Sequence, residues 1–412
     1  MSRRRLASFE LSAEEFTSLR SLALARGDLL EQDGSALLAF GTAEEIALRN
    51  GLADDDAVAA VGGRLQELGA PGALPIALGA LPFRPDAPAH LRLPEVAALR
   101  RDSGTVAVVT GPDPAALLES LLGEARSRGR GHGPVPDQFS LCSARSHDDF
   151  LTRVAKAIAE VRSGRLEKVV LAREVRIEAN RDFCQEDLLE RLRALHPSCL
   201  TFAVEGFIGA SPELLVAREQ EAVRSHPLAG TAARSGDPES DARAAAQLLA
   251  SEKERSEHRA VVEAIAGALS PLTRELSVPP GPAIVSLRNV SHLGTEITGS
   301  LAPRPGGGLP SALEALALVH PTPAVCGTPR ETALEYIEKE EEVERGRYGG
   351  PVGWVRSDGD GEFHLGIRAG TVEGPTARLF AGVGIVADSD PAAELGETQL
   401  KLQAMLAALV RP

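Results

Sequence analysis

The chain has 412 residues and a formal net charge of −14, with a sequence pI near 5.3. This acidity argues against nucleic acid or an anionic membrane as a partner, because both would repel the chain. The length allows two or three domains or one large α+β unit. Apolar stretches are short and interrupted, and the four cysteines show no paired metal-ligand spacing. We therefore expect no membrane span, reduced thiols and a cytoplasmic location.

A polar, glycine-rich stretch at 126–136 divides the chain. We expect residues 1–136 to form the N-terminal half of a layered fold and residues 137–412 to carry the functional site. Beyond the divide, hydrophobic periodicity predicts runs of strands between long helices, which is typical of α+β layers rather than of a βαβ repeat. The predicted helices are 147–163, 185–195, 238–269, 310–319, 330–344 and one starting near 390; the predicted strands are 167–177, 200–208, 213–218, 222–227, 283–290, 350–357, 362–372 and 377–386.

Two ionisable residues in the middle of the chain are candidates for acid and base chemistry. Lys168 opens an apolar strand, where partial burial beside other cations would favour the neutral amine that a base requires. Glu213 lies between Pro212 and a buried strand, where a carboxyl group would hold its proton and could act as a general acid. Taken singly, a lysine that reaches water and a turn acid that faces solvent are the commoner explanations.

A carboxylate in the predicted helix 238–269 points inward. Glu257 falls on the apolar stripe of Val261, Ala264 and Ile265. Because an unpaired buried charge is expensive, Glu257 should meet an arginine or a metal ion. His258 lies about 100° round the helix and is not expected to be a ligand.

The strand 378–386 and the helix after it form the most informative segment. Gly382 and Gly384 would let a ligand approach the strand backbone, or else mark a bend. In the helix, Glu394 and Glu397 are three residues apart and Lys401 is four further on, so that all three project from one face.

This helix has clear starting signals. Ser389 or Asp390 can cap it and Pro391 suits its first position. A solvated face with one ion pair is the commoner explanation for its three charged residues alone. Together with Glu257, however, Glu394 and Glu397 offer oxygen ligands only, which favour a hard ion such as Mg²⁺ with positions left open for substrate oxygens.

Nine segments occur in the order found in the chorismate-utilising enzyme family, and the chain most closely resembles its isochorismate synthases. The segments are KVVLAR, SPELL, HPLAGTAAR, SEHRAVVEAI, HLGTEITG, LVHPTPAVCGTP, RYGGPVGW, GIRAG and AGVGIVADSDPAAELGETQLKL. The resemblance is dense from about Leu166 onward. It implies an α+β, layered chorismate-binding fold with antiparallel sheets packed against helices, in which residues 137–412 are the chorismate-binding catalytic region.

The same resemblance implies roles for individual residues. Lys168 matches the base that activates water for attack at C2 of chorismate, and Glu213 matches the acid that protonates the hydroxyl leaving C4. Glu257 and Glu397 match Mg²⁺ ligands, and Glu394 matches a carboxylate that acts through water. The residues implied to contact the substrate are Gly230, Thr231, His292, Ala324, Tyr348, Arg368, Gly382, Gly384 and Lys401.

Lysine at position 168 also separates branches of the family. The aminating relatives usually carry glutamine there, because ammonia needs no base. Salicylate synthases share the lysine, form isochorismate and then eliminate pyruvate, so they are the close competitor. Ala324 resembles the isochorismate synthase version of its segment, since salicylate-forming relatives tend to carry a polar residue there.

Other readings of the sequence are open. A regulatory paralogue that binds chorismate without turnover would be expected to lack part of the acid, base or metal set, which is complete here. The acidic run 335–344 fits a solvated face better than a partner-binding helix. The resemblance implies a monomer without an amidotransferase subunit, and isochorismate that feeds either menaquinone or catechol-siderophore synthesis.

Overall fold

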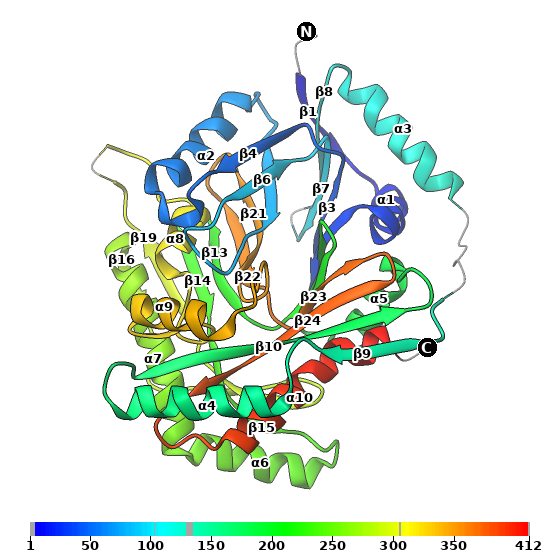
Figure 1. Ribbon diagram of the computed structural model, residues 1–412. Coiled ribbons are helices and arrows are strands. Elements are labelled where there is room, and N and C mark those ends of the chain that lie inside the picture. The colour runs from blue at the N-terminus through cyan, green and yellow to red at the C-terminus, as the bar shows by residue number, and fades with distance from the viewer. Residues whose placement is uncertain (1–4, 103, 129–134, 305, 411–412) are drawn as a thin grey trace.

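The chain forms two large antiparallel sheets with helices packed on their outer faces and beneath them (Figure 1). The structure is a computed structural model that describes residues 5–102, 104–128, 135–304 and 306–410. Every strand pair within these ranges is antiparallel. The predicted α+β fold class is therefore confirmed.

The larger sheet has twelve strands and the second has nine, while a small sheet of three strands lies below them. In spatial order the larger sheet contains β1 (Arg5–Glu10), β8 (Gly104–Gly111), β7 (Val96–Arg101), β3 (Ser35–Phe40), β2 (Asp28–Gln32), β11 (Leu200–Val204), β12 (Phe207–Ser211), β23 (Ala369–Glu373), β24 (Thr376–Ile385), β10 (Lys168–Ala179) and β20 (Gly327–Thr328), with β9 (Phe139–Ser143) beside β10. The second contains β16 (Thr273–Ser277), β19 (Ile297–Leu301), β14 (Ala222–His226), β13 (Leu214–Glu219), β22 (Gly361–Leu365), β21 (Pro351–Arg356), β5 (Ile76–Ala80), β6 (Ala89–Leu93) and β4 (Glu44–Leu48). The small sheet contains β15 (Leu228–Ala233), β18 (Val290–Gly294) and β17 (Ala283–Ser286).

Both large sheets combine strands from either side of the stretch 126–136. The N-terminal part contributes β1, β8, β7, β3 and β2 to one sheet and β5, β6 and β4 to the other. Helix α3 continues to Ser127, so the predicted loop begins later than Arg126, and its residues 129–134 lie outside the described part of the chain.

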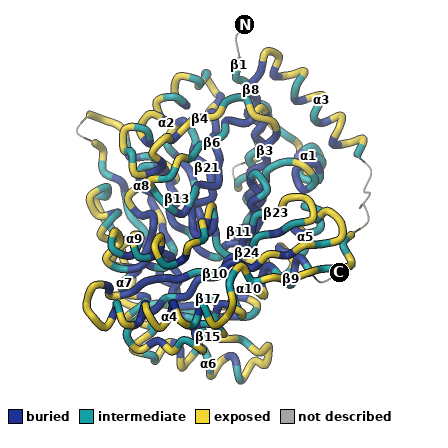
Figure 2. Tube along the Cα trace, viewed as in Figure 1, coloured by how far each residue is buried: buried dark blue, intermediate teal, exposed yellow. Residues whose placement is uncertain are grey.

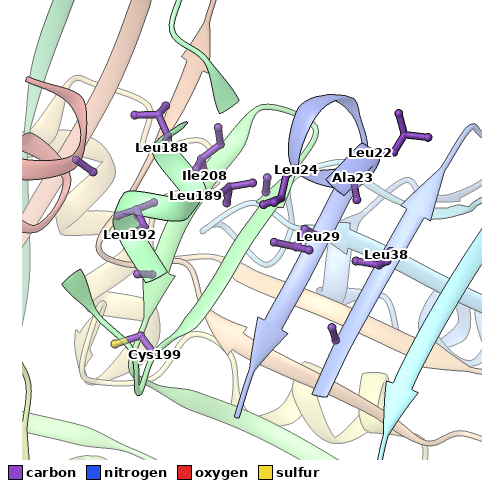
Figure 3. Packing of buried hydrophobic residues seen from close by; sticks show 14 of the residues in the cluster. Leu22, Ala23, Leu24, Leu29, Leu38, Leu188, Leu189, Leu192, Cys199 and Ile208 are labelled. Atoms are coloured by element: carbon purple, nitrogen blue, oxygen red, sulfur yellow. The ribbon is translucent and has the colours of Figure 1, made fainter. Parts of the chain in front are cut away.

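Apolar clusters hold the layers together. One joins the helices α1 (Ala13–Arg26) and α5 (Gln185–Leu195) to the outer face of the larger sheet (Figure 3). Another, which includes Phe202, Phe207 and Trp354, lies between the two large sheets. Figure 2 shows the strands buried and the outer turns of the helices exposed.

The remaining helices are α2 (Asp55–Leu68), α3 (Pro114–Ser127), α4 (His147–Arg162), α6 (Pro238–Ala250), α7 (Glu252–Leu269), α8 (Ala312–Val319), α9 (Arg330–Glu341) and α10 (Pro391–Leu409), with 3-10 turns η1 (Gly51–Ala53) and η2 (Ser270–Leu272).

Three predicted elements are each divided in two. The strand 200–208 is a hairpin, because Glu205 and Gly206 have positive φ angles of 50° and 77° between β11 and β12. The helix 238–269 breaks at Ser251, which adopts an extended conformation and caps α7 through the Glu254 amide. The strand 362–372 breaks at Arg368, whose φ is 51°.

Other elements agree with the sequence. Helix α5 has the predicted ends, and α10 begins after Asp390, whose side chain accepts a hydrogen bond from the Ala393 amide at 2.9 Å. Pro391 occupies the predicted first position. The strands β15, β16, β18 and β19 were not predicted from periodicity, because they are short and half-buried or rich in small residues. Within the described residues, no helix is both long and apolar enough to cross a membrane.

Candidate active site

One pocket gathers nearly all the residues that the sequence singled out. It lies where β24 and the start of β10 meet α7, α10 and the small sheet, and helix α10 runs directly beneath the two strands (Figure 1). The predicted residues that line this pocket are Glu213, Gly230, Thr231, Glu257, His292, Ala324, Tyr348, Arg368, Gly382, Gly384, Glu394, Glu397 and Lys401.

Lys168 is not part of the pocket lining but lies directly behind it. Its side chain is buried, and its Nζ donates a hydrogen bond to Glu257 Oε1 at 2.7 Å. A Cβ atom at Gly384 would come within 2.6 Å of Lys168 Cε. Glycine at 384 therefore leaves the space in which the lysine reaches Glu257. The sequence predicted an arginine or a metal ion beside Glu257, and the cation that the structure places there is Lys168.

Gly382 is held by two side chains of the pocket. Its amide donates to the Tyr348 hydroxyl at 2.8 Å, and its carbonyl accepts from Lys401 Nζ at 3.0 Å. A Cβ atom there would lie 3.1 Å from Val170 and 3.4 Å from the tyrosine oxygen. The glycine thus lets Tyr348 and Lys401 approach the strand.

Glu213 is a fully enclosed carboxyl group in the turn between β12 and β13. The turn is fixed by Ser211, whose hydroxyl donates to the Leu365 carbonyl at 2.6 Å and accepts from the Glu213 amide at 3.3 Å. Burial raises the pKa of Glu213 to about 8, although the Leu228 amide and the charge of Arg368 oppose the shift. Its Oε1 has no hydrogen-bond partner among the described residues. A raised pKa is what the sequence led us to expect for this carboxyl group, whose role as an acid stays a prediction.

Arg368 and His292 form a second polar pair. Burial, followed by the charge of Arg368, lowers the pKa of His292 to about 3, so the imidazole is neutral. Its Nδ1 lies 2.9 Å from the Gly230 carbonyl, which can only accept, so Nδ1 carries the proton. The unprotonated Nε2 then accepts from Arg368 Nη2 at 3.3 Å. Within the described residues, Arg368 forms no ion pair with a carboxylate, and its guanidinium is available to an anion.

Four further glutamates line the pocket, Glu254 and Glu257 on α7 and Glu394 and Glu397 on α10. Burial and then the charge of Glu257 raise the pKa of Glu254. Burial also raises the pKa of Glu394, and the charge of Glu397 adds to the effect. Burial opposes ionisation of Glu397 too, yet its 2.7 Å ion pair with Lys401 leaves its pKa lowered.

The carboxylates fit a hard divalent cation in chemistry but are not gathered into a finished coordination shell. All four carboxylates offer oxygen donors. Burial raises the pKa of Glu254 and of Glu394, and neighbouring negative charge, which a cation would relieve, adds to the shift. Within the described residues, however, no three His, Cys, Asp or Glu side chains are close enough together to hold a metal ion. Binding would therefore draw the two helices' carboxylates together.

Sequence reasoning missed Glu254 and misplaced the buried stripe of its helix. Glu254 lines the pocket and accepts from the Thr231 amide at 3.3 Å. Its spacing of three residues from Glu257 repeats that of Glu394 and Glu397, a signal that was readable. The stripe actually buried on α7 is His258, Val261, Val262, Ile265 and Leu269, whereas Ala264 is exposed.

His258 belongs to that stripe and lies outside the pocket lining. Its Nε2 is 2.7 Å from the Thr295 hydroxyl. Burial lowers the pKa of His258 to about 4, so it is a neutral core residue.

The four cysteines are all free: Cys142, Cys184, Cys199 and Cys326.

A layered α+β fold whose pocket sets an unpaired arginine and a protonated carboxyl group against four glutamates defines a protein that handles a small anionic molecule. A family model described as "Chorismate binding enzyme" matches residues 111–410, and the chain belongs to this family. The family recognised from the nine ordered motifs is therefore confirmed.

Named relatives are isochorismate synthases. The chain is 36% identical over 352 residues to isochorismate synthase DhbC of Bacillus subtilis, which covers 81% of each chain. It is 38% identical over 305 residues to isochorismate synthase MenF of the same organism, covering 73% of this chain and 64% of the relative. A "Salicylate biosynthesis isochorismate synthase" of Pseudomonas aeruginosa is 42% identical over 287 residues, 69% of this chain and 59% of that relative's length.

Solved structures share the whole fold. A putative 2,3-dihydroxybenzoate-specific isochorismate synthase, DhbC from Bacillus anthracis, superposes with a TM-score of 0.81 at 34% identity, over 96% of this chain and 99% of that chain. Anthranilate synthase component I from Streptococcus pneumoniae superposes with a TM-score of 0.66 at 21% identity, over 97% and 92% of the two chains, a likeness in fold alone.

Proposed function

We propose that this chain is an isochorismate synthase, which adds water at C2 of chorismate and releases the C4 hydroxyl as water. One observation carries the proposal: the buried amine of Lys168 and the protonated carboxyl group of Glu213 come from different elements to the same site. One group can accept a proton while the other donates one, as the replacement of one hydroxyl by another requires.

The proton balance follows from these two groups. Lys168 accepts a proton from the attacking water as the C2–O bond forms. Glu213 donates its proton to the C4 oxygen as the C4–O bond breaks, and the ring double bonds shift between them. Because Lys168 is paired with Glu257 in this structure, it becomes a base only when the charge of that carboxylate is shared with another cation.

We propose Mg²⁺ as that cation, held by Glu257 and Glu397, with Glu394 acting through water and Glu254 beside them. When bound, the ion would supply positive charge for the ring carboxylate near Gly230 and Thr231. The oxygen-only donor set supports this assignment.

Arg368 is the proposed partner of the enolpyruvyl carboxylate. A guanidinium offers paired N–H donors that match a carboxylate, and here none of them is taken by an acidic side chain of the described chain. Tyr348 and Lys401 would complete this end of the pocket through the backbone of Gly382. Neutral His292 keeps the arginine in place without adding charge.

The relatives' names support isochorismate formation and divide between pathways. DhbC from Bacillus anthracis is named for 2,3-dihydroxybenzoate and the P. aeruginosa relative for salicylate, while the MenF of Escherichia coli, a solved structure, is named menaquinone-specific. Menaquinone and catechol-siderophore synthesis are thus both proposed destinations of the product. A cytoplasmic, monomeric enzyme without an amidotransferase subunit also stays a prediction.

Product analysis tests the proposal. The purified chain is incubated with chorismate, with and without Mg²⁺, and the products are separated by liquid chromatography and identified by mass spectrometry. Isochorismate that forms only with Mg²⁺ and approaches a mixture with chorismate is expected. Salicylate with pyruvate would assign the chain to the salicylate synthases instead, and bound but unchanged chorismate would make it a binding protein.

A further inference from the structure

The strand that carries Lys168 lacks a neighbouring strand over part of its length. On one side β24 pairs with β10 from Val169 to Glu178. On the other side β20 pairs only with Lys168 and Val169, and β9 begins at Val175. In the part of the chain that the structure describes, no strand faces residues 170–174 on this side.

A buried ion pair fills this gap. Arg345 Nη2 donates a hydrogen bond to the Val170 carbonyl at 2.7 Å, and the Ala172 amide donates to Glu341 Oε1 at 2.7 Å. Arg345 Nε donates to Glu341 Oε2 at 2.8 Å, so the two side chains form one unit. The pair thus supplies the donor and the acceptor that a neighbouring strand would otherwise offer to β10.

The same guanidinium also holds another wall of the pocket. Arg345 Nη1 donates to the Val325 carbonyl at 2.8 Å, directly after Ala324. The guanidinium lies over the Phe83 ring at 4.2 Å, which fixes its plane. Arg345 therefore connects the strand that carries Lys168 to the segment whose Ala324 lines the pocket.

The burial of the pair indicates a geometric rather than an energetic purpose. The side chains of Glu341 and Arg345 are only 6% and 2% exposed. A buried ion pair adds little stability over an apolar pair of similar volume, because removing two charges from water is costly. What an apolar pair could not do is complete the hydrogen bonds of Val170, Ala172 and Val325.

We propose that the Glu341–Arg345 pair positions the catalytic base: it holds the start of β10 against the segment Ala324–Val325, and so sets the place of the Lys168 amine relative to the substrate ring. Arg345 lines the pocket, but its Nε, Nη1 and Nη2 already donate to Glu341, Val325 and Val170. Glu341 and Arg345 therefore act through Lys168 and are positioning residues. The inference rests on the proposed function. A displaced base slows proton transfer without weakening the contacts that bind chorismate.

Arg345→Lys is the sharpest test, because lysine keeps the charge but cannot reach acceptors on three segments with one ammonium group. We expect kcat to fall by about 10- to 100-fold, with KM unchanged within about threefold. Arg20→Lys is the matched control: Arg20 of α1 forms a similar two-point pair with Glu31 of β2, at 2.8 Å from Nε, away from the pocket. It should lose comparable stability and keep its kcat.

Hydrogen exchange measures the positioning itself. Peptides covering residues 168–174 should exchange at least about tenfold faster in Arg345→Lys than in the wild-type protein or in Arg20→Lys, because the Ala172 amide loses its fixed acceptor. Where Arg345→Lys does not fold, Glu341→Gln replaces it; the amide still offers an acceptor to Ala172 but no charge to Arg345.

The possible results of these experiments separate the proposed positioning role from a purely structural one. A folded variant with wild-type kcat, or Arg345→Lys with wild-type exchange over residues 168–174, overturns the inference. A fall in kcat that Arg20→Lys shares equally also overturns it, since loss of stability would explain both. Should the wild-type chain not convert chorismate, the proposed function fails, while the exchange rates still decide whether the pair holds the strand.

Discussion

The pocket lining contains two groups of side chains that differ in charge, the glutamates of α7 and α10 and the group around Arg368. On the side of α7 and α10, negative charge accumulates, and it is relieved only in part by Lys168 and Lys401. On the other side, Arg368 stands beside a neutral histidine and a carboxyl group that keeps its proton. Among the described residues Arg368 has no carboxylate in an ion pair with it, whereas the four glutamates outnumber the two lysines paired with them.

This difference indicates how a protein with a net negative charge could bind chorismate, which carries two carboxylates. In the proposed function, one carboxylate of the substrate would meet Arg368 directly. The other would reach the glutamates through a cation that both the glutamates and the substrate can share. Five predictions test this contrast and the helix that carries its glutamates, beginning with the largest expected effect.

Replacing Lys168 by Gln should remove the base from the acidic side. Turnover should fall by about 10³-fold, the usual contribution of a general base, while Mg²⁺ binding stays largely intact. Steady-state kinetics with chorismate measure the change. Lys156→Gln, which alters a lysine that is 60% exposed on α4, serves as the control. Unchanged turnover in Lys168→Gln would remove this residue from the base role.

Protonation of Glu213 should make both the stability and the activity of the protein depend on pH. Its folded-state pKa is raised from 4.5 to about 8, so the stability that this group contributes is fully present below pH 4.5 and is lost as pH rises to about 8. Glu213→Gln should inactivate the enzyme yet raise its unfolding free energy at pH 8, on the order of 4 kcal/mol at 1.36 kcal/mol per pKa unit.

Denaturant unfolding of the wild type and of Glu213→Gln at pH 5 and pH 8 checks this. The gain should be clearly larger at the higher pH. Wild-type turnover should also decline above pH 8, as the acid loses its proton. A gain that is equal at both values of pH would show that Glu213 ionises normally.

Arg368→Lys should weaken substrate binding on the cationic side. Losing a paired, charge-assisted contact costs about 1.5–3 kcal/mol, which raises KM for chorismate roughly 10- to 100-fold. Arg378→Lys, on the same sheet but paired with Glu174 at 2.7 Å, should leave KM unchanged. Equal KM values for both variants would place the enolpyruvyl carboxylate elsewhere.

Glu257→Gln and Glu397→Gln each remove one charge from the acidic side. Affinity for Mg²⁺ should fall by about tenfold or more, because site affinity follows the number of charged ligands. Calorimetric titration with Mg²⁺ alone reads this out independently of turnover. Glu263→Gln, an exposed residue of α7, is the control. Normal titration in the pocket variants would contradict the ligand assignment.

The smallest effect concerns the start of α10. Asp390→Ala removes the side-chain cap on the Ala393 amide, which should cost about 1 kcal/mol of unfolding free energy. Turnover should change by no more than about twofold, because packing of Leu402, Met405 and Leu409 holds the rest of the helix. A midpoint shift in thermal unfolding checks the first part, and a large loss of turnover would contradict the second.

Elements with local signals could be predicted from sequence, and elements shaped by distant contacts could not. The start of α10 is encoded by Asp390 and Pro391 themselves. The break at Arg368 is different, because a left-handed arginine within a strand-like run is stabilised by His292, which lies 76 residues away. The turn at Glu205 and Gly206 fell within an apolar run and was read as continuous strand.

The candidate site shows the same division. Charged residues at helical spacing pointed to the pocket, yet the buried face of α7 was misjudged because small alanines obscure its stripe. The position of Lys168 behind Gly384 follows from strand pairing and could not be read from periodicity. Its role as a base came from resemblance to a family and is still a prediction.

The most direct measurement is the fate of oxygen during turnover. With chorismate and Mg²⁺ in H₂¹⁸O, water attack at C2 predicts that the first isochorismate formed carries one ¹⁸O atom, located at C2 by mass-spectrometric fragmentation, and that Lys168→Gln forms almost none. Isochorismate formed without the label would mean that the hydroxyl migrates within the substrate, and would contradict the assignment of Lys168 and Glu213 as base and acid.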